Sequence, residues 1–530
     1  MAVLAGGARA QRIRESSWYK WAVALTVSLG ALMEVIDVSI VNVALPHMQS
    51  SLGATLSQIG WVITGYAMAN VVIIPLGAWL SDRFGQRNYY LFTLVAFVAS
   101  SVLCGLSTSL GMLVFARIMQ GLFGGGLLPK AQSILFETFP PHQQGMAQAL
   151  FGIGVVVGPA FGPTLGGYLT DMMGWRWIFF INLPVGILAV LMALMFVPDK
   201  PRRATGRVDL LGILLLAAGL GSMQVLLEQG REYDWFQSGY IVTLAVVCVV
   251  ALVAFVRHEL RIPNPAVNLR VLKYKPLWAG SLYSIVLGVG LYGTTFVIPV
   301  FTQNILHFTA TQTGELMIPG SLIMVIFMPL AGILLSRFDA RILVGIGSLI
   351  LIGMIMRLSH VNSQTTAEFF FWPLMWRGMG LPLMFIPLSV ATLGTIPKDD
   401  VSSAAGLYNL TRQIGGSLGI AVLTFVLDRR FDFHFQRLAE GIGAYDPNSL
   451  QFLSGIQGFL QGRGYDMLQS QTAALKVVTG LVQQQAMVLS FEDVYLFVAS
   501  LFVCALPLLL ILGKGHAANR RKGAPAPAAH

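Results

Sequence analysis

The sequence predicts an all-α polytopic membrane protein that crosses the bilayer about fourteen times. Only 11% of the 530 residues are charged and 55% are hydrophobic, whereas a soluble domain carries charge on about a quarter of its positions. Apolar runs long enough for a helix to cross a bilayer recur along the chain, and they are continuous, unlike the alternating strands of a membrane barrel. The runs cover 21–45, 59–80, 89–106, 110–136, 144–169, 177–196, 208–227, 240–256, 276–302, 314–335, 342–358, 369–390, 402–427 and 493–512.

The first run could be confused with a secretory signal peptide, because Arg9, Arg12 and Arg14 precede it. It is longer than the apolar region of a signal peptide, and it contains Glu34 and Asp37. We therefore expect it to be the first permanent span.

The net charge of +10 reflects membrane topology. Lys and Arg concentrate in the two tails and in the loops after even-numbered spans, whereas the short loops on the opposite side hold only Arg176, Arg231 and Arg357. The positive-inside rule then places both termini in the cytoplasm. Nucleic acid is not expected as a partner.

No cofactor or metal site is predicted. Cys104, Cys248 and Cys504 fall in separate spans, and the eight histidines are scattered without metal spacing. A membrane enzyme is a weaker alternative, because neither an HExxH-like pattern nor a local serine-triad signature occurs.

Two parts of the chain resemble each other. Residues 75–87 and 329–341 are identical at six of thirteen positions, at an offset of 254, and Gln120-Gly121 corresponds to Arg377-Gly378 at an offset of 257. Internal repeats of this kind are common in transporter folds. We expect a tail at 1–20, a six-helix bundle at 21–196, two inserted helices at 208–256, a second six-helix bundle at 276–512 that includes an outer loop at 428–492, and a tail at 513–530.

The loop between the second and third spans combines glycines, an acid and two basic residues. Gly85 permits a tight turn, and an acidic side chain such as Asp82 suits a helix N-terminus, where the helix dipole favours negative charge. A loop that only sets topology needs neither. The pattern consists of Gly77, Asp82, Arg83, Gly85 and Arg87.

Ionisable residues inside spans are costly and mark functional sites. Glu34 and Asp37 lie three residues apart on one face of the first span, and Arg117 lies in the fourth span before Gln120. A buried carboxylate beside a guanidinium can be switched between ionised and protonated states when the pairing changes. Asp37, Glu34 and Arg117 are the candidates for proton coupling.

The fifth span carries glycines at every fourth position, which leave a bare stripe for close helix packing, and two prolines that remove backbone donors. Packing alone is an alternative explanation of the stripe. The pattern consists of Gly154, Gly158, Pro159, Gly162, Pro163 and Gly166.

These three motifs resemble those of the major facilitator superfamily. The 77–87 loop is similar to the signature loop that latches the outward-open state, the Arg117 segment to the fourth-helix motif, and the glycine stripe to the motif of antiporters. Residues 36–46 and 175–186 resemble signatures of the fourteen-helix drug:proton antiporters, and 228–238 resembles the EmrB-type subgroup. That subgroup has a neutral polar residue where Glu34 stands, which leaves proton stoichiometry and substrate charge open.

The resemblance implies a major facilitator fold and a proton-coupled antiporter that exports hydrophobic or amphipathic drugs across the bacterial inner membrane. It also implies a periplasmic adaptor (membrane fusion protein) and an outer-membrane channel as partners. An exporter dedicated to a siderophore, fatty acid or other metabolite and a passive facilitator are the alternatives. Polar or amphipathic residues within spans are the candidates for lining a substrate cavity at the midplane: Asn42, Gln120, Tyr292, Arg377, Tyr408, Asn409 and Arg412.

Overall fold

The computed structural model describes residues 18–199, 208–442 and 447–513, so Arg9, Arg12 and Arg14 lie outside the described residues. Within these ranges all regular structure is helical. The longer helices are α2 (Tyr19–Leu52), α3 (Leu56–Ile73), α4 (Gly77–Phe84), α5 (Gln86–Gly105), α6 (Leu110–Gly124), α7 (Leu127–Thr138), α8 (Gln144–Met173), α9 (Trp177–Phe180), α10 (Asn182–Phe196), α11 (Leu210–Gln229), α12 (Gly239–Glu259), α13 (Lys275–Gly288), α14 (Thr294–Asn304), α15 (Ala310–Arg337), α16 (Ala340–Leu358), α17 (Ala367–Leu393), α18 (Val401–Glu440), α19 (Pro447–Gln461) and α20 (Met467–Ala505).

Helices occupy every one of the predicted spans. Twelve helical segments of the described chain are long and apolar enough to cross a membrane, or thirteen when α3 and α4 are counted as one span bent by 61°. The fifth predicted span is the 30-residue helix α8. The chain is therefore a multi-pass membrane protein, as its composition predicted.

Several spans are not straight α-helices. The fourth span breaks into α6 and α7 at Gly125 and Gly126, and the ninth contains the π-helix η4 (Val289–Gly293) between α13 and α14. Such breaks free backbone groups, and in a bilayer these groups need protein partners. Breaks in spans therefore mark places where function is expected.

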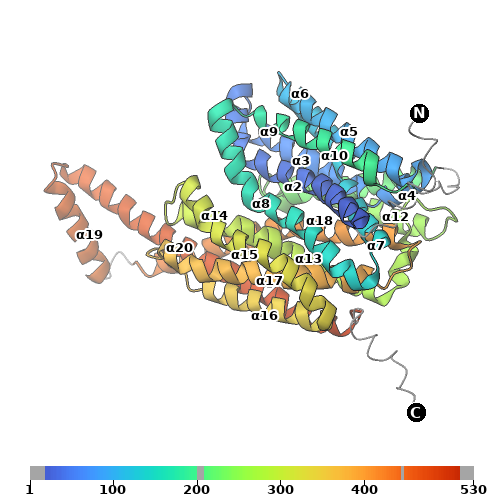
Figure 1. Cartoon of the computed structure of the whole chain (residues 1–530). Coiled ribbons are helices and arrows are strands. Elements are labelled where there is room, and N and C mark those ends of the chain that lie inside the picture. The colour runs from blue at the N-terminus through green and yellow to red at the C-terminus, as the bar shows by residue number, and fades with distance from the viewer. Residues whose placement is uncertain (1–17, 200–207, 443–446, 514–530) are drawn as a thin grey trace, which may run out of the picture.

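The helices form two packed groups that meet along α8, α15, α7 and α18. In Figure 1 the blue and teal helices α2 to α10 lie together above the yellow and orange helices α13 to α17. α8 packs against both α2 and α15, and α18 packs against α7 as well as α13 and α20. α11 packs against α3 and α18, and α12 covers α11.

The outer face of α12 is the clearest lipid-facing surface. It exposes a continuous apolar stripe that consists of Val246, Val249, Val250 and Val253. Soluble monomeric proteins rarely expose apolar patches of this kind to water. In a membrane this stripe faces the hydrocarbon of the lipids instead of water.

The two groups repeat one contact. Arg87, at the start of α5, donates to the carbonyl of Leu194 near the end of α10. Arg341, its counterpart at an offset of 254, donates to the carbonyl of Leu512 just after η5 (Leu506–Leu510). In both groups the arginine of the short loop therefore fastens the third helix to the end of the sixth.

The glycine stripe of α8 lies against α2. The Ser39 hydroxyl of α2 donates to the carbonyl of Gly158 at 3.0 Å, and a Cβ added at Gly158 would lie 2.6 Å from a methyl carbon of Val35. Absent side chains thus let the two backbones approach. Pro159 and Pro163 lie within the same unbroken helix.

α18, α19 and α20 extend beyond the helical body. α18 continues past the end of the predicted span at 427 into the expected outer loop and ends at Glu440. Figure 1 shows α19 and the first turns of α20 far from the other helices, at the opposite end from α4. The last predicted span, 493–512, begins inside α20, which starts at Met467, so the end of the expected outer loop and the last span form one continuous helix. Another part of the expected loop forms α19.

We predict that Gly166→Ala destabilises the fold by roughly 1–3 kcal/mol, the usual cost of overpacking. A Cβ at Gly166 would lie 2.7 Å from Cγ1 and 2.9 Å from the carbonyl oxygen of Ile40, and the backbone cannot yield locally. Gly167→Ala is the matched control, because its nearest neighbour is Val43 at 3.8 Å. Thermal unfolding in detergent measures both. Equal unfolding temperatures for the two variants would contradict the close packing of α2 and α8.

Candidate functional site

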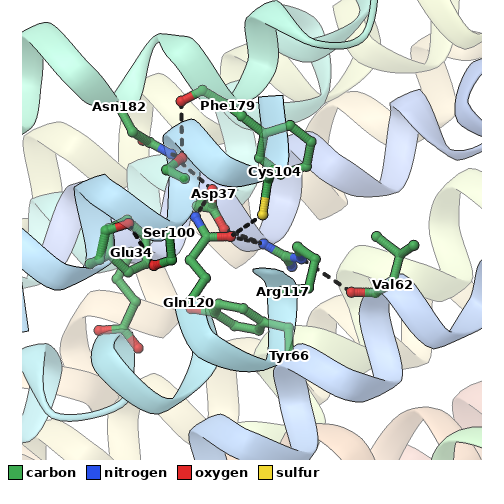
Figure 2. Close-up of polar contacts among 12 residues, drawn as sticks. Glu34, Asp37, Val62, Tyr66, Ser100, Cys104, Arg117, Gln120, Phe179 and Asn182 are labelled. Atoms are coloured by element: carbon green, nitrogen blue, oxygen red, sulfur yellow. Dashed lines mark hydrogen bonds and ion pairs between the residues drawn. The ribbon is translucent and has the colours of Figure 1, made fainter. Parts of the chain in front are cut away.

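A buried carboxylate lies at the centre of the first group of helices. Asp37 of α2 has no exposed surface and accepts hydrogen bonds from Arg117 of α6 at 2.6 Å, from the Gln120 amide at 2.8 Å and from the Asn182 amide of α10 at 2.8 Å. Figure 2 shows Asp37 between Asn182 on one side and Arg117 with Gln120 on the other. Three helices therefore converge on one acidic side chain.

Arg117 is held from several directions. Its Nε donates to the carbonyl of Val62 at 3.1 Å, and one Nη donates to the Gln120 amide oxygen at 2.7 Å. Its guanidinium lies 4.2 Å from the centre of the Tyr66 ring, a favourable cation–π distance. The pairing of Arg117 with Asp37 therefore depends on α3 as well as α2 and α6.

Asn182 is positioned by a second set of contacts. Its amide also donates to Ser101 of α5 at 3.0 Å, and the Ser101 hydroxyl donates to the carbonyl of Phe179 at 2.9 Å. The short segment α9–α10 is thereby tied to α5 beside Asp37. Asn182 was not among the predicted site residues, although a polar amide inside the predicted 177–196 span was a visible signal.

The energetics of this site favour a switch. Taking an ion pair out of water costs several kcal/mol per ion, and only good geometry offsets that cost. If Asp37 took up a proton, Arg117 would remain as a buried cation without a counter-ion, and the surrounding helices would have to shift or another anion would have to enter. Proton uptake at Asp37 would therefore favour a rearrangement of the helices around it.

Glu34 belongs to a separate cluster one turn away. It is 3% exposed and accepts from the Asn70 amide at 3.0 Å and from the backbone N–H of Leu128 at 3.2 Å. Leu128 lies in the first turn of α7, so Glu34 meets the N-terminus created by the α6–α7 break. Within the described residues Glu34 forms no ion pair, and Figure 2 shows it pointing away from Asp37.

Tyr66 lies between the two acidic clusters. Its ring contacts Arg117, and its hydroxyl accepts from the Asn70 amide at 3.5 Å. A movement of side chains in either cluster can therefore shift Tyr66 and so alter the contacts of the other cluster.

A third polar network joins the two groups of helices. Arg412 donates to Asn409 on α18 at 2.5 Å, Asn409 donates to Gln132 of α7 at 2.6 Å, and Gln132 donates to Ser389 of α17 at 2.8 Å. Ser389 also donates to Gln148 of α8 at 3.2 Å. Asn409 and Arg412 were predicted as site residues from the sequence. Gln132, Gln148 and Ser389 were not, because only the packing of the two groups brings them together.

The other candidates for the substrate cavity are dispersed. Gln120 belongs to the Asp37 cluster, Asn42 is exposed on α2, and Tyr408 is fully buried. Tyr292 is half-buried in η4, and Arg377 donates to Thr295 and to the carbonyl of Leu291 in the same span. A common cavity formed by these residues stays a prediction.

The residues of the proposed latch lie at a turn on α4. Gly85 has φ 88° and ψ 142°, which an L side chain rarely adopts, so the predicted tight turn is confirmed. Arg83 lies over the Trp79 ring. α4, which carries Gly77 and Asp82, packs against α18. A contact between Asp82 and the N-terminus of α18 stays a prediction.

Within the described ranges, no group of three or more His, Cys, Asp or Glu side chains is arranged to hold a metal ion.

Comparison with known proteins places this geometry in a family. A family model described as Major Facilitator Superfamily matches residues 27–420. The chain belongs to the major facilitator superfamily. Multidrug export protein EmrB of Escherichia coli K12 is 34% identical over 488 residues, which cover 92% of this chain and 94% of that protein. Fatty acid resistance protein FarB of Neisseria gonorrhoeae is 32% identical over 492 residues, 92% of this chain and 95% of that one.

Solved structures support the fold. The human organic anion transporter MFSD10 (TETRAN) aligns with a TM-score of 0.57 at 14% identity, covering 91% of this chain and 99% of that one. At this identity the likeness speaks for the fold alone. The predicted major facilitator fold and the resemblance to EmrB-type proteins are thus both confirmed.

Proposed function

We propose that this protein is a proton-coupled antiporter that exports hydrophobic or amphipathic small molecules, drugs among them, by alternating access. The observation that carries this proposal is the buried Asp37–Arg117 ion pair, which joins the first and fourth spans of a major facilitator fold. Similarity to proteins named for multidrug export supports drugs as the cargo.

The proposed cycle uses Asp37 as the proton carrier. Protonation neutralises Asp37 and releases Arg117, so the contacts among α2, α6 and α10 are free to change. The Gln132 network between the two groups of helices then opens on one side of the membrane. Loss of the proton on the other side restores the ion pair. Glu34, which has its own partners, modulates the cycle or the choice of substrate charge.

An exporter dedicated to one metabolite remains the second candidate, because a relative of comparable identity is named for fatty acid resistance. An enzymatic role has little support, since the family and its structural neighbours are transporters. A panel of toxic compounds tested in an efflux-deficient strain would separate broad from narrow export.

We further infer that the protein lies in a bacterial inner membrane with both termini in the cytoplasm. The concentration of Lys and Arg in the loops that share a side with the α4–α5 turn supports this orientation. The two relatives named above come from Escherichia coli and Neisseria gonorrhoeae, bacteria that have an inner and an outer membrane. With this orientation, α19 projects into the periplasm.

The projecting helices are proposed to dock a periplasmic adaptor that continues to an outer-membrane channel. Phe452 and Phe459, seven residues apart and therefore on one face of α19, are 54% and 60% exposed. Leu468 and Leu475 are exposed on the adjoining part of α20. Aromatic side chains exposed in this way commonly become the centre of protein interfaces.

We predict that Asp37→Asn abolishes uphill, proton-driven export while the protein still inserts and folds. The amide keeps the size and polarity of the carboxylate but cannot titrate, so substrate movement loses its coupling. Transport in proteoliposomes with an imposed pH gradient measures this, using a compound that the panel shows to be exported. Glu34→Gln is the control, and we expect it to retain uphill transport or to lose it only for cationic compounds. Undiminished transport by Asp37→Asn would remove Asp37 from the mechanism.

We predict that the double substitution Phe452→Ser and Phe459→Ser leaves transport in proteoliposomes intact but removes drug resistance from cells. Loss of two aromatic anchors weakens an interface by more than about tenfold, whereas the membrane spans are untouched. Gln451→Ser, also exposed on α19, is the matched control and should keep full resistance. Minimal inhibitory concentrations provide the measurement. Full resistance in the double variant would contradict docking at this face.

A further inference from the structure

The two groups of helices differ in their buried charge. In the first group the cation Arg117 is neutralised by Asp37 at 2.6 Å. In the second group Arg377 and Arg412 are 7% and 3% exposed, and neither forms an ion pair within the described residues. The second group therefore keeps buried positive charge without a carboxylate of its own.

The sequence repeat shows how this difference arises. Arg377 corresponds to Gln120 at an offset of 257. Gln120 donates to the carboxylate of Asp37, whereas Arg377 donates to the hydroxyl of Thr295 and to the carbonyl of Leu291, both uncharged acceptors. At corresponding places of the repeat, the first group therefore has an amide that binds an acid, and the second has a cation that binds only uncharged acceptors.

Arg377 has capacity left for a ligand. Its Nε is buried and has no hydrogen-bond partner, although a guanidinium offers five N–H donors in a planar fork that fits carboxylate, sulfonate or phosphate oxygens. It lies near the middle of α17 and beside the π-helix η4, which carries the half-buried Tyr292. A charged group this deep in a span is expensive unless something pairs with it.

We propose that Arg377 is the binding residue for the anionic group of the transported molecule, so that the favoured substrates are amphipathic organic anions. The negative group pairs with the guanidinium, and the apolar part lies among the surrounding side chains. This inference rests on the proposed export function and specifies its substrate class. Arg412 of α18 is a second buried cation with one Nη that has no hydrogen-bond partner, but it already donates to Asn409 in the network between the two groups.

The alternative is that Arg377 only stabilises η4 through Leu291 and Thr295. The two roles differ in their effect on ligands of opposite charge. If Arg377 only stabilises η4, its substitution weakens the binding of anions and cations equally, whereas a binding role predicts a loss for anions alone. Arg377→Gln is the informative substitution, since it installs the residue type found at Gln120 and keeps hydrogen-bond donors. Arg377→Lys keeps the charge and reports on folding together with the unfolding temperature.

The experiment uses two probes with the same decyl chain and permanent opposite charges, decanesulfonate and decyltrimethylammonium. Calorimetric titration of the full-length protein in lipid nanodiscs, with empty nanodiscs subtracted, measures their affinities. Loss of a buried charge-assisted contact should weaken decanesulfonate binding by about tenfold or more in Arg377→Gln. Arg377→Lys should retain most of the affinity, and the affinity for decyltrimethylammonium should not fall in either variant.

Two results would overturn the inference: wild-type protein that binds only the cationic probe, or Arg377→Gln that weakens both probes equally. A different result would contradict the proposed function alone: decanesulfonate binding that depends on Arg377, together with transport that is not accompanied by proton movement. A protein that couples protons to export but binds decanesulfonate independently of Arg377 contradicts this inference alone.

Discussion

The burial of one carboxylate in a membrane helix is the constraint on which the rest of the structure depends. Asp37 lies out of contact with water, and its charge is offset by a guanidinium and two amides from α6 and α10. Those donors are held in turn by Val62, Ser101 and the Tyr66 ring. The contacts among α2, α6 and α10 at this depth are therefore centred on a single acid, and a change of its protonation state disturbs all three helices.

The contacts between the two groups are of a different kind. Gln132, Gln148, Ser389 and Asn409 join neutral side chains through hydrogen bonds. Neutral hydrogen bonds are individually weaker than charge-assisted ones. Among the described residues, a charged donor that crosses between the two groups is Lys130 of α7, which donates to the Ser402 hydroxyl of α18 at 3.5 Å. The first group is thus held by a buried ion pair, whereas the two groups are joined mainly by weaker hydrogen bonds. This arrangement suits a protein that alternates between two conformations.

Sequence predicted most of the fold because membrane spans, short charged loops and glycine stripes leave strong local patterns. It also singled out Asp37, Arg117 and Gln120, since ionisable and polar residues inside apolar runs are conspicuous. It could not choose Asn182 or Gln132 from many amides, because their roles depend on which spans become neighbours. The continuity of α20 was missed for a related reason: its glutamines interrupt the hydropathy pattern but not the helix.

Proton exchange at Asp37 is tested most directly by adding an exported compound to the purified protein in a weakly buffered solution and following the pH. A proton carrier that competes with substrate should release protons, so the solution of wild-type protein should acidify, whereas that of Asp37→Asn should not. An unchanged pH on substrate binding to the wild-type protein, or equal acidification by Asp37→Asn, would contradict a proton antiporter centred on this residue.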